Sequence, residues 1–290
     1  MNSSTIRNII TLLFLSIIWG SSFILIKKGL LAFAPDHVGT LRITFAYLVL
    51  LPVALKYLRK YFREYWWKFL LLGLVSNLIP AILFALAETG LSSSVTGILN
   101  SLTPIFTLIV GGLFFSITFE KKKILGLTLG LIGSIILTFV GSAGSLGNFN
   151  YYVIYVLIAT ICYGFGGNMV KSFFPKLNSL IFTSLAVFFV GPISIFYLIL
   201  TNAYQSLNHE YAYSSLFYIF VLGAIGTAAA LVIFNKLIQN TSAVFASTVT
   251  YLIPIAAVFW GILDGEVLYP AHAVGTLFII SGVYFVNKNR

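Results

Sequence analysis

Long runs of apolar residues, separated by short polar or charged segments, make up most of this chain. A helix needs about 20 mainly apolar residues to cross the ~30 Å hydrocarbon core of a bilayer. Scanning the chain with a window of that length predicts ten transmembrane helices. They cover residues 8–26, 38–55, 69–87, 91–119, 124–140, 151–170, 180–200, 216–234, 243–263 and 271–286.

The helix pattern repeats itself after five helices. Residues 73–106 match residues 223–256 at a constant offset of 150, and residues 19–27 match residues 163–171 at an offset of 144. Offsets change only between helices, where loop lengths vary at little cost. Because five is an odd number, the second unit must enter the membrane from the opposite side. We therefore expect two inverted five-helix repeats, residues 1–145 and 146–290.

Composition supports an all-α integral membrane protein. Of the 290 residues, 59% are hydrophobic and 8% are charged, which is more apolar surface than a soluble core of this size can bury. The net charge of +10 comes without a basic stripe or a nucleic-acid motif, so the expected partner is a lipid bilayer and not nucleic acid.

Basic residues predict the orientation, because Lys and Arg are retained in cytoplasmic loops. Apart from Arg42, which falls within a predicted helix, only Lys27 and Lys28 lie on one side of the predicted topology. Both termini should therefore be cytoplasmic, in the cytoplasmic (inner) membrane. The opposite side holds Arg7, Lys56, Arg59, Lys60, Arg63, Lys68, Lys121, Lys122, Lys123, Lys171, Lys176, Lys236, Lys288 and Arg290.

Inverted repeats are typical of secondary transporters, in which a cavity between two halves opens to one side and then to the other. Pro104 and Pro254 occupy matching places within the apolar runs, where a proline removes a backbone hydrogen bond and bends a helix. We interpret them as paired hinges. Channels can also contain inverted repeats, so a passive pathway remains an alternative.

Four features of the chain form recognisable patterns: Trp19–Phe23 (WGSSF), Arg42 early in the second span, Ala85–Thr107 and Ile253–Gly282. Together they resemble the EamA-type carriers of the drug/metabolite transporter superfamily. This resemblance implies a ten-helix bundle with cytoplasmic termini that moves metabolites such as amino acids, often outward. Carriers of this type commonly have a Gly-Glu turn before the last helix of each half. The second half of this chain has that turn as Gly265-Glu266, but the position that matches Glu266 in the first half is Ile117.

Polar residues of the fourth span share one helical face, because Thr96, Asn100, Thr103 and Thr107 are spaced four, three and four residues apart. They are either a polar wall of a substrate cavity or a packing face whose hydroxyls bond to their own backbone. Asn100 favours the cavity, because its amide costs more to leave unpaired in hydrocarbon.

A second face, on the third span, carries Asn77, Phe84 and Glu88. Asn77 lies deep enough to line a cavity, whereas Glu88 lies near the outer end, where a solvated carboxylate is the favoured interpretation. If Glu88 is buried, it becomes the best candidate for proton coupling. Arg42 could hold a substrate carboxylate, but a side chain that snorkels to the headgroups is favoured.

For the remaining candidates, packing is the default interpretation. Trp19 and Tyr163 are matched aromatic residues, each followed by glycine, and either stack on substrate or fill the bundle. The candidate substrate-binding residues are Trp19, Ser22, Asn77, Phe84, Asn100, Thr103, Tyr163, Asn168, Phe234, Asn235, Thr250 and Tyr251.

Enzyme chemistry is not expected. There is no nucleotide fingerprint, the lone Cys162 and three histidines offer no metal site, and no catalytic set is evident, so we predict no cofactor. The sequence predicts a secondary transporter of small metabolites, amino acids or related amphipathic or zwitterionic compounds. Export by alternating access is favoured, with a passive channel or a lipid-acting enzyme as alternatives. The coupling ion and the oligomeric state are left open.

Overall fold

The computed structural model describes residues 3–117, 125–126, 128–129, 132–133, 136 and 150–287. Within these residues every regular element is a helix and there is no strand, so the all-α prediction is confirmed. The α-helices are α1 (Ser3–Gly29), α2 (Pro35–Gly73), α3 (Ile79–Ala87), α4 (Ser93–Leu99), α5 (Thr103–Phe114), α7 (Tyr152–Phe173), α8 (Ser179–Leu200), α9 (Ala212–Gly223), α10 (Ala230–Asn240), α11 (Ala243–Ser247), α12 (Ile253–Leu263) and α13 (Pro270–Asn287).

Seven of the described helices are long and apolar enough to cross a membrane, which confirms a multi-pass membrane protein. One of them runs from Pro35 to Ala87 without a break in helical structure. The predicted fifth span, residues 124–140, falls almost wholly outside the described residues. The ten-helix count therefore stays a prediction.

The predicted loop between residues 55 and 69 is wrong, because this basic segment is helical. Neither Gly nor Pro occurs between Pro52 and Gly73, and rings along the segment lie next to each other one helical turn apart, as in Tyr57 and Tyr61 with centroids 6.5 Å apart. The chain nevertheless reverses direction here. Gly39, near the start of α2, lies directly against Ile82 in α3.

The predicted fourth span ends earlier than expected. Its helix stops at Phe114, and Ser116 adopts a left-handed backbone conformation with φ of 55°. This span is also interrupted. Residues Asn100–Leu102 form a short 3₁₀ segment between α4 and α5.

Helix irregularities occur in matching places of the two predicted repeats. Leu74–Leu78 and Ala224–Ala229 are π-helical, and they start 150 residues apart. In each, a side chain bonds to the carbonyl five residues earlier: Asn77 to that of Leu72 at 3.4 Å, and Thr227 to that of Leu222 at 3.1 Å. The 3₁₀ segments Asn100–Leu102 and Thr248–Tyr251 form a similar pair.

Close backbone contacts also occur in reciprocal pairs. A Cβ atom at Gly73 would overlap the carbonyl oxygen of Ala186 on α8, and one at Gly223 would lie 2.7 Å from the carbonyl oxygen of Arg42 on α2. Each contact joins one predicted repeat to the other. Small residues let helices approach closely in membranes, where hydrophobic driving force between helices is weak.

A further reciprocal pair exchanges serine and glycine. Ser22 on α1 lies against Gly226, and Ser76 lies against Gly166 on α7. At the predicted offsets Ser22 matches Gly166, and Ser76 matches Gly226. In both contacts the serine comes from the first predicted unit, from its first helix in one contact and from its third helix in the other.

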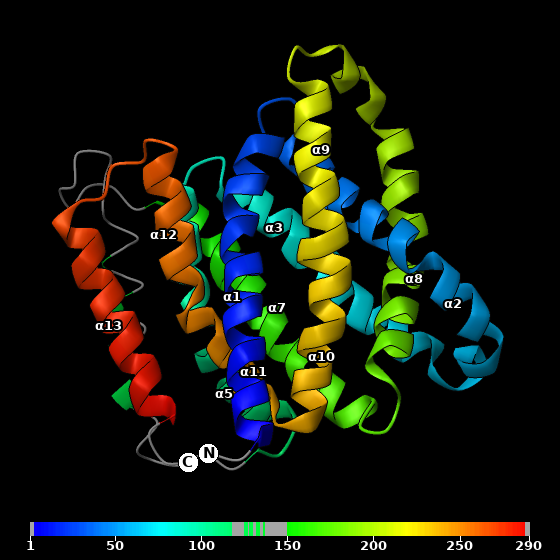
Figure 1. Cartoon of the computed structure of the whole chain (residues 1–290), viewed down its shortest axis with the longest axis horizontal. Coiled ribbons are helices and arrows are strands. Elements are labelled where there is room, and N and C mark those ends of the chain that lie inside the picture. The colour runs from blue at the N-terminus through cyan, green and yellow to red at the C-terminus, as the bar shows by residue number, and fades with distance from the viewer. Residues whose placement is uncertain are drawn as a thin grey trace.

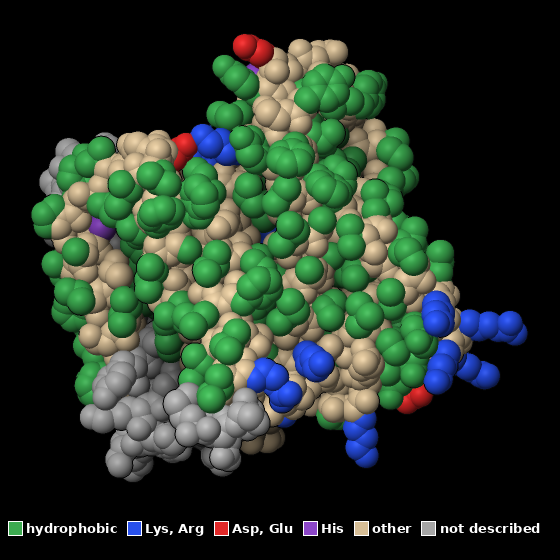
Figure 2. All heavy atoms as spheres, viewed as in Figure 1, with side chains coloured by type: hydrophobic (Ala, Val, Ile, Leu, Met, Phe, Trp, Pro, Cys, Tyr) green, Lys and Arg blue, Asp and Glu red, His purple; other side chains and the backbone are tan. Residues whose placement is uncertain are grey.

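Figure 1 shows α1 in the middle of the molecule, with α12 and α13 on one side and α9, α10 and α8 on the other. One large buried cluster surrounds the break between α4 and α5 and includes Leu99, Leu102 and Ile105. A second contains the ring stack of Phe69, Phe174 and Phe182, with centroids 5.2 and 5.0 Å apart. Apolar side chains cover much of the visible surface (Figure 2).

Gly73→Ala should lower the thermal stability of the protein in detergent. The added methyl group meets a backbone carbonyl that cannot move aside, and overpacking of this kind costs about 1–3 kcal/mol, which exceeds the gain in helix propensity of about 1 kcal/mol.

Gly167→Ala is the matched control, because its Cβ would lie 3.4 Å from that of Ala243, an ordinary contact. Melting curves of the two variants should separate clearly. Equal midpoints would contradict the close contact at Gly73.

Candidate functional site

A cavity lies between the helices of the two predicted repeats. Its volume is about 90 Å³. One water needs roughly 10–15 Å³ by that measure, so several waters or a small organic molecule fit. Among the predicted site residues it is lined by Trp19, Ser22, Arg42, Asn77, Phe84, Asn100, Thr103, Tyr163, Phe234, Asn235 and Thr250.

Four aromatic rings form two matched pairs on the cavity wall. Trp19 meets Phe234 edge to face with centroids 4.8 Å apart, and Tyr163 stacks on Phe84 at 5.7 Å. Trp19 matches Tyr163 and Phe84 matches Phe234 in the repeat, so each pair joins one unit to the other. The sequence predicted these four positions together, and the structure brings them to one cavity.

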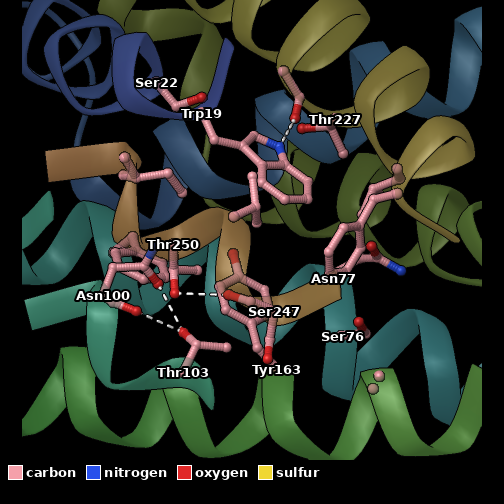
Figure 3. A pocket seen from close by; sticks show the side chains of 18 of the residues that line it. Trp19, Ser22, Ser76, Asn77, Asn100, Thr103, Tyr163, Thr227, Ser247 and Thr250 are labelled. Atoms are coloured by element: carbon pink, nitrogen blue, oxygen red, sulfur yellow. Dashed lines mark hydrogen bonds between the residues drawn. The ribbon is translucent and has the colours of Figure 1, made fainter. Parts of the chain in front are cut away.

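Trp19 is fixed by the π-helical segment that follows α9. Its indole Nε1 donates a hydrogen bond to the carbonyl oxygen of Gly226 at 2.9 Å (Figure 3). A buried indole N–H is costly to leave unpaired, and this carbonyl satisfies it without drawing the ring out of the cavity.

Arg42 is buried, so the snorkelling interpretation is wrong. Only 8% of the residue is exposed, and its Nε donates a hydrogen bond of 2.7 Å to Oγ1 of Thr227. That hydroxyl in turn bonds to the carbonyl of Leu222 in α9. Within the described chain, Arg42 is the sole charged residue that lines the cavity.

The terminal nitrogens of Arg42 form no hydrogen bond with any described residue. They are also not fully buried, and Arg42 is part of the cavity lining. A guanidinium offers five N–H donors in a planar fork. Most of that donor capacity is therefore available to a molecule inside the cavity. The sequence could not reveal this, because Thr227 lies 185 residues further along the chain.

The polar stripe of the fourth span combines both interpretations weighed for it. Thr103 and Thr107 line the cavity, yet their hydroxyls bond to the carbonyls of Asn100 and Thr103 at 2.7 and 2.8 Å. Thr96 is buried away from the cavity. Asn100 accepts a 3.2 Å bond from Thr103, and its amide nitrogen has no described partner. Asn100 thus offers a donor to the cavity (Figure 3).

Two candidate residues lie outside the cavity lining. Asn168 donates from Nδ2 to the carbonyls of Thr107 at 2.9 Å and Gly164 at 2.8 Å, so its amide joins α7 to α5. Tyr251 belongs to the 3₁₀ segment before α12 but does not line the space. For Asn168 the packing interpretation fits the structure, because backbone carbonyls already occupy its donors.

Several cavity residues were not predicted. Ser76, Thr227 and Ser247 contribute hydroxyl groups to the lining. Thr227 could have been found from the repeat, because it is the counterpart of Asn77. Ser247 approaches the cavity only because α11 ends there in a 3₁₀ segment.

Pro104 and Pro254 follow the 3₁₀ breaks directly and occupy the first turn of α5 and α12. There a proline lacks only an N–H that would be unpaired anyway. The two breaks touch, because Ser101 donates from Oγ to the carbonyl of Thr250 at 2.8 Å. The prolines therefore begin the second half of each broken helix, while their role as hinges stays a prediction.

The EamA-like transporter family matches this chain over residues 6–139 and 150–288. The chain belongs to the EamA-like transporter family. It is therefore a membrane transporter and not an enzyme, as the sequence predicted.

Similar proteins are named as transporters. An uncharacterized transporter of Archaeoglobus fulgidus is 25% identical over 280 residues, covering 94% of this chain and 95% of its own length. An S-adenosylmethionine/S-adenosylhomocysteine transporter of Chlamydia muridarum is 24% identical over 288 residues, covering 94% and 89%. A solved crystal structure shares the fold, with a TM-score of 0.62, 15% identity, and 96% of this chain and 95% of that chain covered.

In this EamA family member a group of charged residues closes the ends of three helices on the side away from the start of α1. Lys27 pairs with Glu266 at 3.1 Å and with Asp264 at 2.8 Å, while Lys28 also pairs with Asp264. Ser93 and Ser94 donate their backbone N–H groups to the Glu266 carboxylate, each at 3.0 Å. We call Lys27, Lys28, Asp264, Glu266 and the Ser93-Ser94 pair the ion cluster.

Glu266 binds two N–H groups in the first turn of α4, next to the N-cap residue Ser92, whose side chain accepts from the N–H of Val95. The Gly265-Glu266 turn, in which Gly265 has φ of 83°, aims the carboxylate at the N–H groups that an α-helix leaves unpaired at its start. Burial alone would raise the pKa of Glu266, but hydrogen bonds from Ser94, Lys27 and Ser93 bring the pKa below its usual value. The hydrogen bonds from Lys27 and Lys28 lower the pKa of Asp264 in the same way.

Glu88, the residue that follows α3, is not solvated as the favoured interpretation had it. Its Oε1 atom is buried and has no hydrogen-bond partner among the described residues, and Oε2 accepts a 3.0 Å bond from the Ser93 hydroxyl. Burial raises the pKa of Glu88 well above its usual range. The negative charge of Glu266 adds to that rise, while the Ser93 bond and the positive charges of Lys27 and Arg42 oppose it.

Glu266→Gln should destabilise the protein at neutral pH, because the side chain is only 6% exposed and loses both its ion pair and part of its hydrogen bonding to the first turn of α4. Removing one partner of such buried hydrogen bonds costs about 1–3 kcal/mol. The exposed Glu210→Gln is the control and should melt like the wild type.

The effect of Glu266→Gln should also depend on pH. A carboxyl whose folded pKa is lowered stabilises the fold above its unfolded pKa of about 4.3, and this contribution disappears as the pH falls through the folded pKa. The melting curves of wild type and variant should therefore converge in acid below about pH 4. A gap that stays constant down to that acidity would show that the carboxylate charge is not what stabilises α4.

Proposed function

We propose that this chain is a secondary transporter that moves small zwitterionic or amphipathic metabolites, amino acids or related compounds, across the cytoplasmic membrane. Transport is outward and proceeds by alternating access between two inverted repeats, residues 1–145 and 146–290. Both termini are cytoplasmic. The substrate-binding residues are those of the predicted set that line the cavity, together with Arg42.

The observation that carries this proposal is the combination of one cation with four aromatic rings. Arg42 has unpaired donors in the cavity, and carboxylate is the group that a guanidinium binds in a paired, bidentate geometry. Trp19, Phe84, Tyr163 and Phe234 surround the same space. A molecule with a carboxylate at one end and an apolar or aromatic body satisfies both features.

Polar groups around Arg42 favour a zwitterion over a simple acid. Asn100 and Asn77 place amide groups on the cavity wall, and amide oxygens accept hydrogen bonds from an ammonium group. No Asp or Glu lines the described cavity, which argues against a cargo with excess positive charge.

Alternating access is supported by the reciprocal contacts between the two repeats. The aromatic pairs, the close glycine contacts and the π-helical segments each occur twice, at the predicted offsets. Such a scaffold has two equivalent ways to pack, which is what a cavity that opens to opposite sides requires. The helix breaks before Pro104 and Pro254 supply the sites at which the helices bend.

An adenosyl amino acid is a second candidate cargo. The Chlamydia relatives are named as transporters of S-adenosylmethionine and S-adenosylhomocysteine. Both compounds combine an amino-acid group with an aromatic base, so the same cation and rings suit them. Their size exceeds that of a free amino acid, and binding them requires the cavity to widen.

The proposed orientation is supported by the distribution of charge. Lys and Arg side chains gather at the lower edge of the molecule in Figure 2, the side at which α1 begins in Figure 1. Cytoplasmic surfaces carry this excess of basic residues. Lys27 and Lys28 lie on the opposite side, where Asp264 and Glu266 neutralise them.

Counterflow in proteoliposomes tests the proposed function. Vesicles loaded with unlabelled amino acids, or with S-adenosylmethionine, should take up the labelled compound transiently and with saturation, because a carrier exchanges one molecule for another across a single site. Linear uptake without saturation would establish the channel alternative. Absence of exchange with both classes of compound would refute the substrate assignment.

Arg42→Gln should raise the KM for the transported compound far more than it alters the maximal rate. A hydrogen bond to a charged group contributes about 1.5–3 kcal/mol, which corresponds to roughly a tenfold to hundredfold change in KM. Arg42→Lys keeps the positive charge but lacks the planar guanidinium fork, so its KM should lie between that of the wild type and that of Arg42→Gln. Arg7→Gln, an exposed arginine of α1, is the control.

The carboxylate itself can be tested with the same variants. The methyl ester of the transported compound should bind wild type and Arg42→Gln alike, because the ester cannot pair with a guanidinium. If Arg42→Gln weakens the ester as much as the free acid, Arg42 acts on packing and not on the carboxylate.

A further inference from the structure

Glu88 occupies a position between the cavity and the ion cluster. It lies one helical turn beyond Phe84, which lines the cavity, and its carboxylate touches Ser93, whose backbone N–H belongs to the ion cluster. Glu88 does not line the cavity, and it forms no ion pair with any described residue.

The hydrogen bonding of Glu88 suits a carboxylic acid better than a carboxylate. An ionised carboxylate has about four acceptor sites, and within the described part of the chain the Ser93 hydroxyl alone fills one of them. Burying a charged group with so few partners is expensive, whereas the protonated form buries far less charge. The proton also converts one of the two oxygens into a donor.

Charged groups around Glu88 are already engaged elsewhere. Lys27 on α1 pairs with Glu266 and Asp264, and Arg42 on α2 bonds to Thr227. Glu266 contributes a like charge, which disfavours ionisation of Glu88. No described cation is therefore reserved for this carboxylate.

Other titratable groups on the neighbouring helices also have different partners or do not reach it. On α2, Asp36 accepts a 2.7 Å bond from the Tyr197 hydroxyl, and His37 contacts the Thr201 hydroxyl at 2.9 Å. From α7, the Tyr152 ring lies against Gly90, and Tyr163 stacks on Phe84. Neither tyrosine bonds to Glu88.

We propose that Glu88 is a proton-binding site that couples transport to the proton gradient, an inference that rests on the proposed function. In the closed arrangement seen here the carboxyl group holds a proton. Release of that proton to water leaves a carboxylate, and protonation from water restores the acid. No other reactant is needed.

Ionisation of Glu88 acts on the ion cluster through shared partners. A bare carboxylate at this position attracts Lys27 and Arg42, and it competes with Glu266 for Lys27. The ion cluster holds α1 against the start of α4 and the turn between α12 and α13. Losing the proton therefore favours separation of these helix ends, and binding it favours their closure.

Infrared spectroscopy of the purified protein in lipid tests the proton site without a substrate. The wild type should show a protonated-carboxyl band that persists to pH values above the usual range of glutamate and then disappears on titration. The band should be absent in Glu88→Gln and unchanged in the exposed control Glu210→Gln. An identical band in all three proteins overturns the inference, whatever the protein transports.

Transport measurements test the coupling. With labelled S-adenosylmethionine or amino acid as the probe, Glu88→Gln should keep counterflow at equal pH on both sides, because exchange requires no net proton movement. Accumulation driven by a gradient of one pH unit should fall by up to about tenfold, because one coupled proton then supplies about 1.4 kcal/mol. Glu88→Asp, which keeps a titratable carboxyl, should recover part of it.

The outcomes separate the two proposals. Driven accumulation that survives in Glu88→Gln overturns the coupling role, and so does loss of counterflow and driven accumulation together, because that pattern assigns Glu88 to the fold. Failure of counterflow in the wild type refutes the proposed function instead, and the infrared titration then still decides whether Glu88 holds the proton.

Discussion

The structure depends on one constraint, that inside a bilayer every backbone N–H and C=O group must find a partner within the protein. Regular α-helical hydrogen bonding is interrupted in the helices around the cavity, and other groups of the protein bond to the backbone there. Asn77 and Thr227 bond to carbonyls left by the π-helical segments, Trp19 bonds to Gly226, and Ser101 bonds to Thr250 across the two 3₁₀ breaks. A polar cavity is possible in this fold because each interruption has its own partner.

The repeat in the sequence predicted much of this arrangement. Offsets of 150 and 144 identified Phe84 with Phe234 and Trp19 with Tyr163, and all four rings line one cavity. Long apolar runs also predicted the helical state of most spans, because a bilayer requires them. They could not predict that the basic segment after Pro52 remains helical, because its charged residues end the apolar run that marks a span.

Long-range partners explain the predictions that were wrong. Arg42 was expected at the headgroups, but its side chain meets Thr227 from the opposite repeat. Glu88 was expected in water, but Ser93 and the Glu266 turn enclose it. Asn168 looked like a cavity residue until backbone carbonyls on α5 and α7 were seen to occupy its amide. In each case at least one neighbour, Thr227, Glu266 or Thr107, lies far away along the chain, and such a contact cannot be deduced from a single sequence.

The exchange of serine and glycine between Ser22–Gly226 and Ser76–Gly166 has a consequence for how such proteins vary. Each contact accommodates one hydroxymethyl group, contributed by either helix. Serine on both helices would overfill the contact, and glycine on both would leave a void. A substitution at one position of a contact therefore stabilises or destabilises the protein according to the residue on the facing helix, so the two positions should change together.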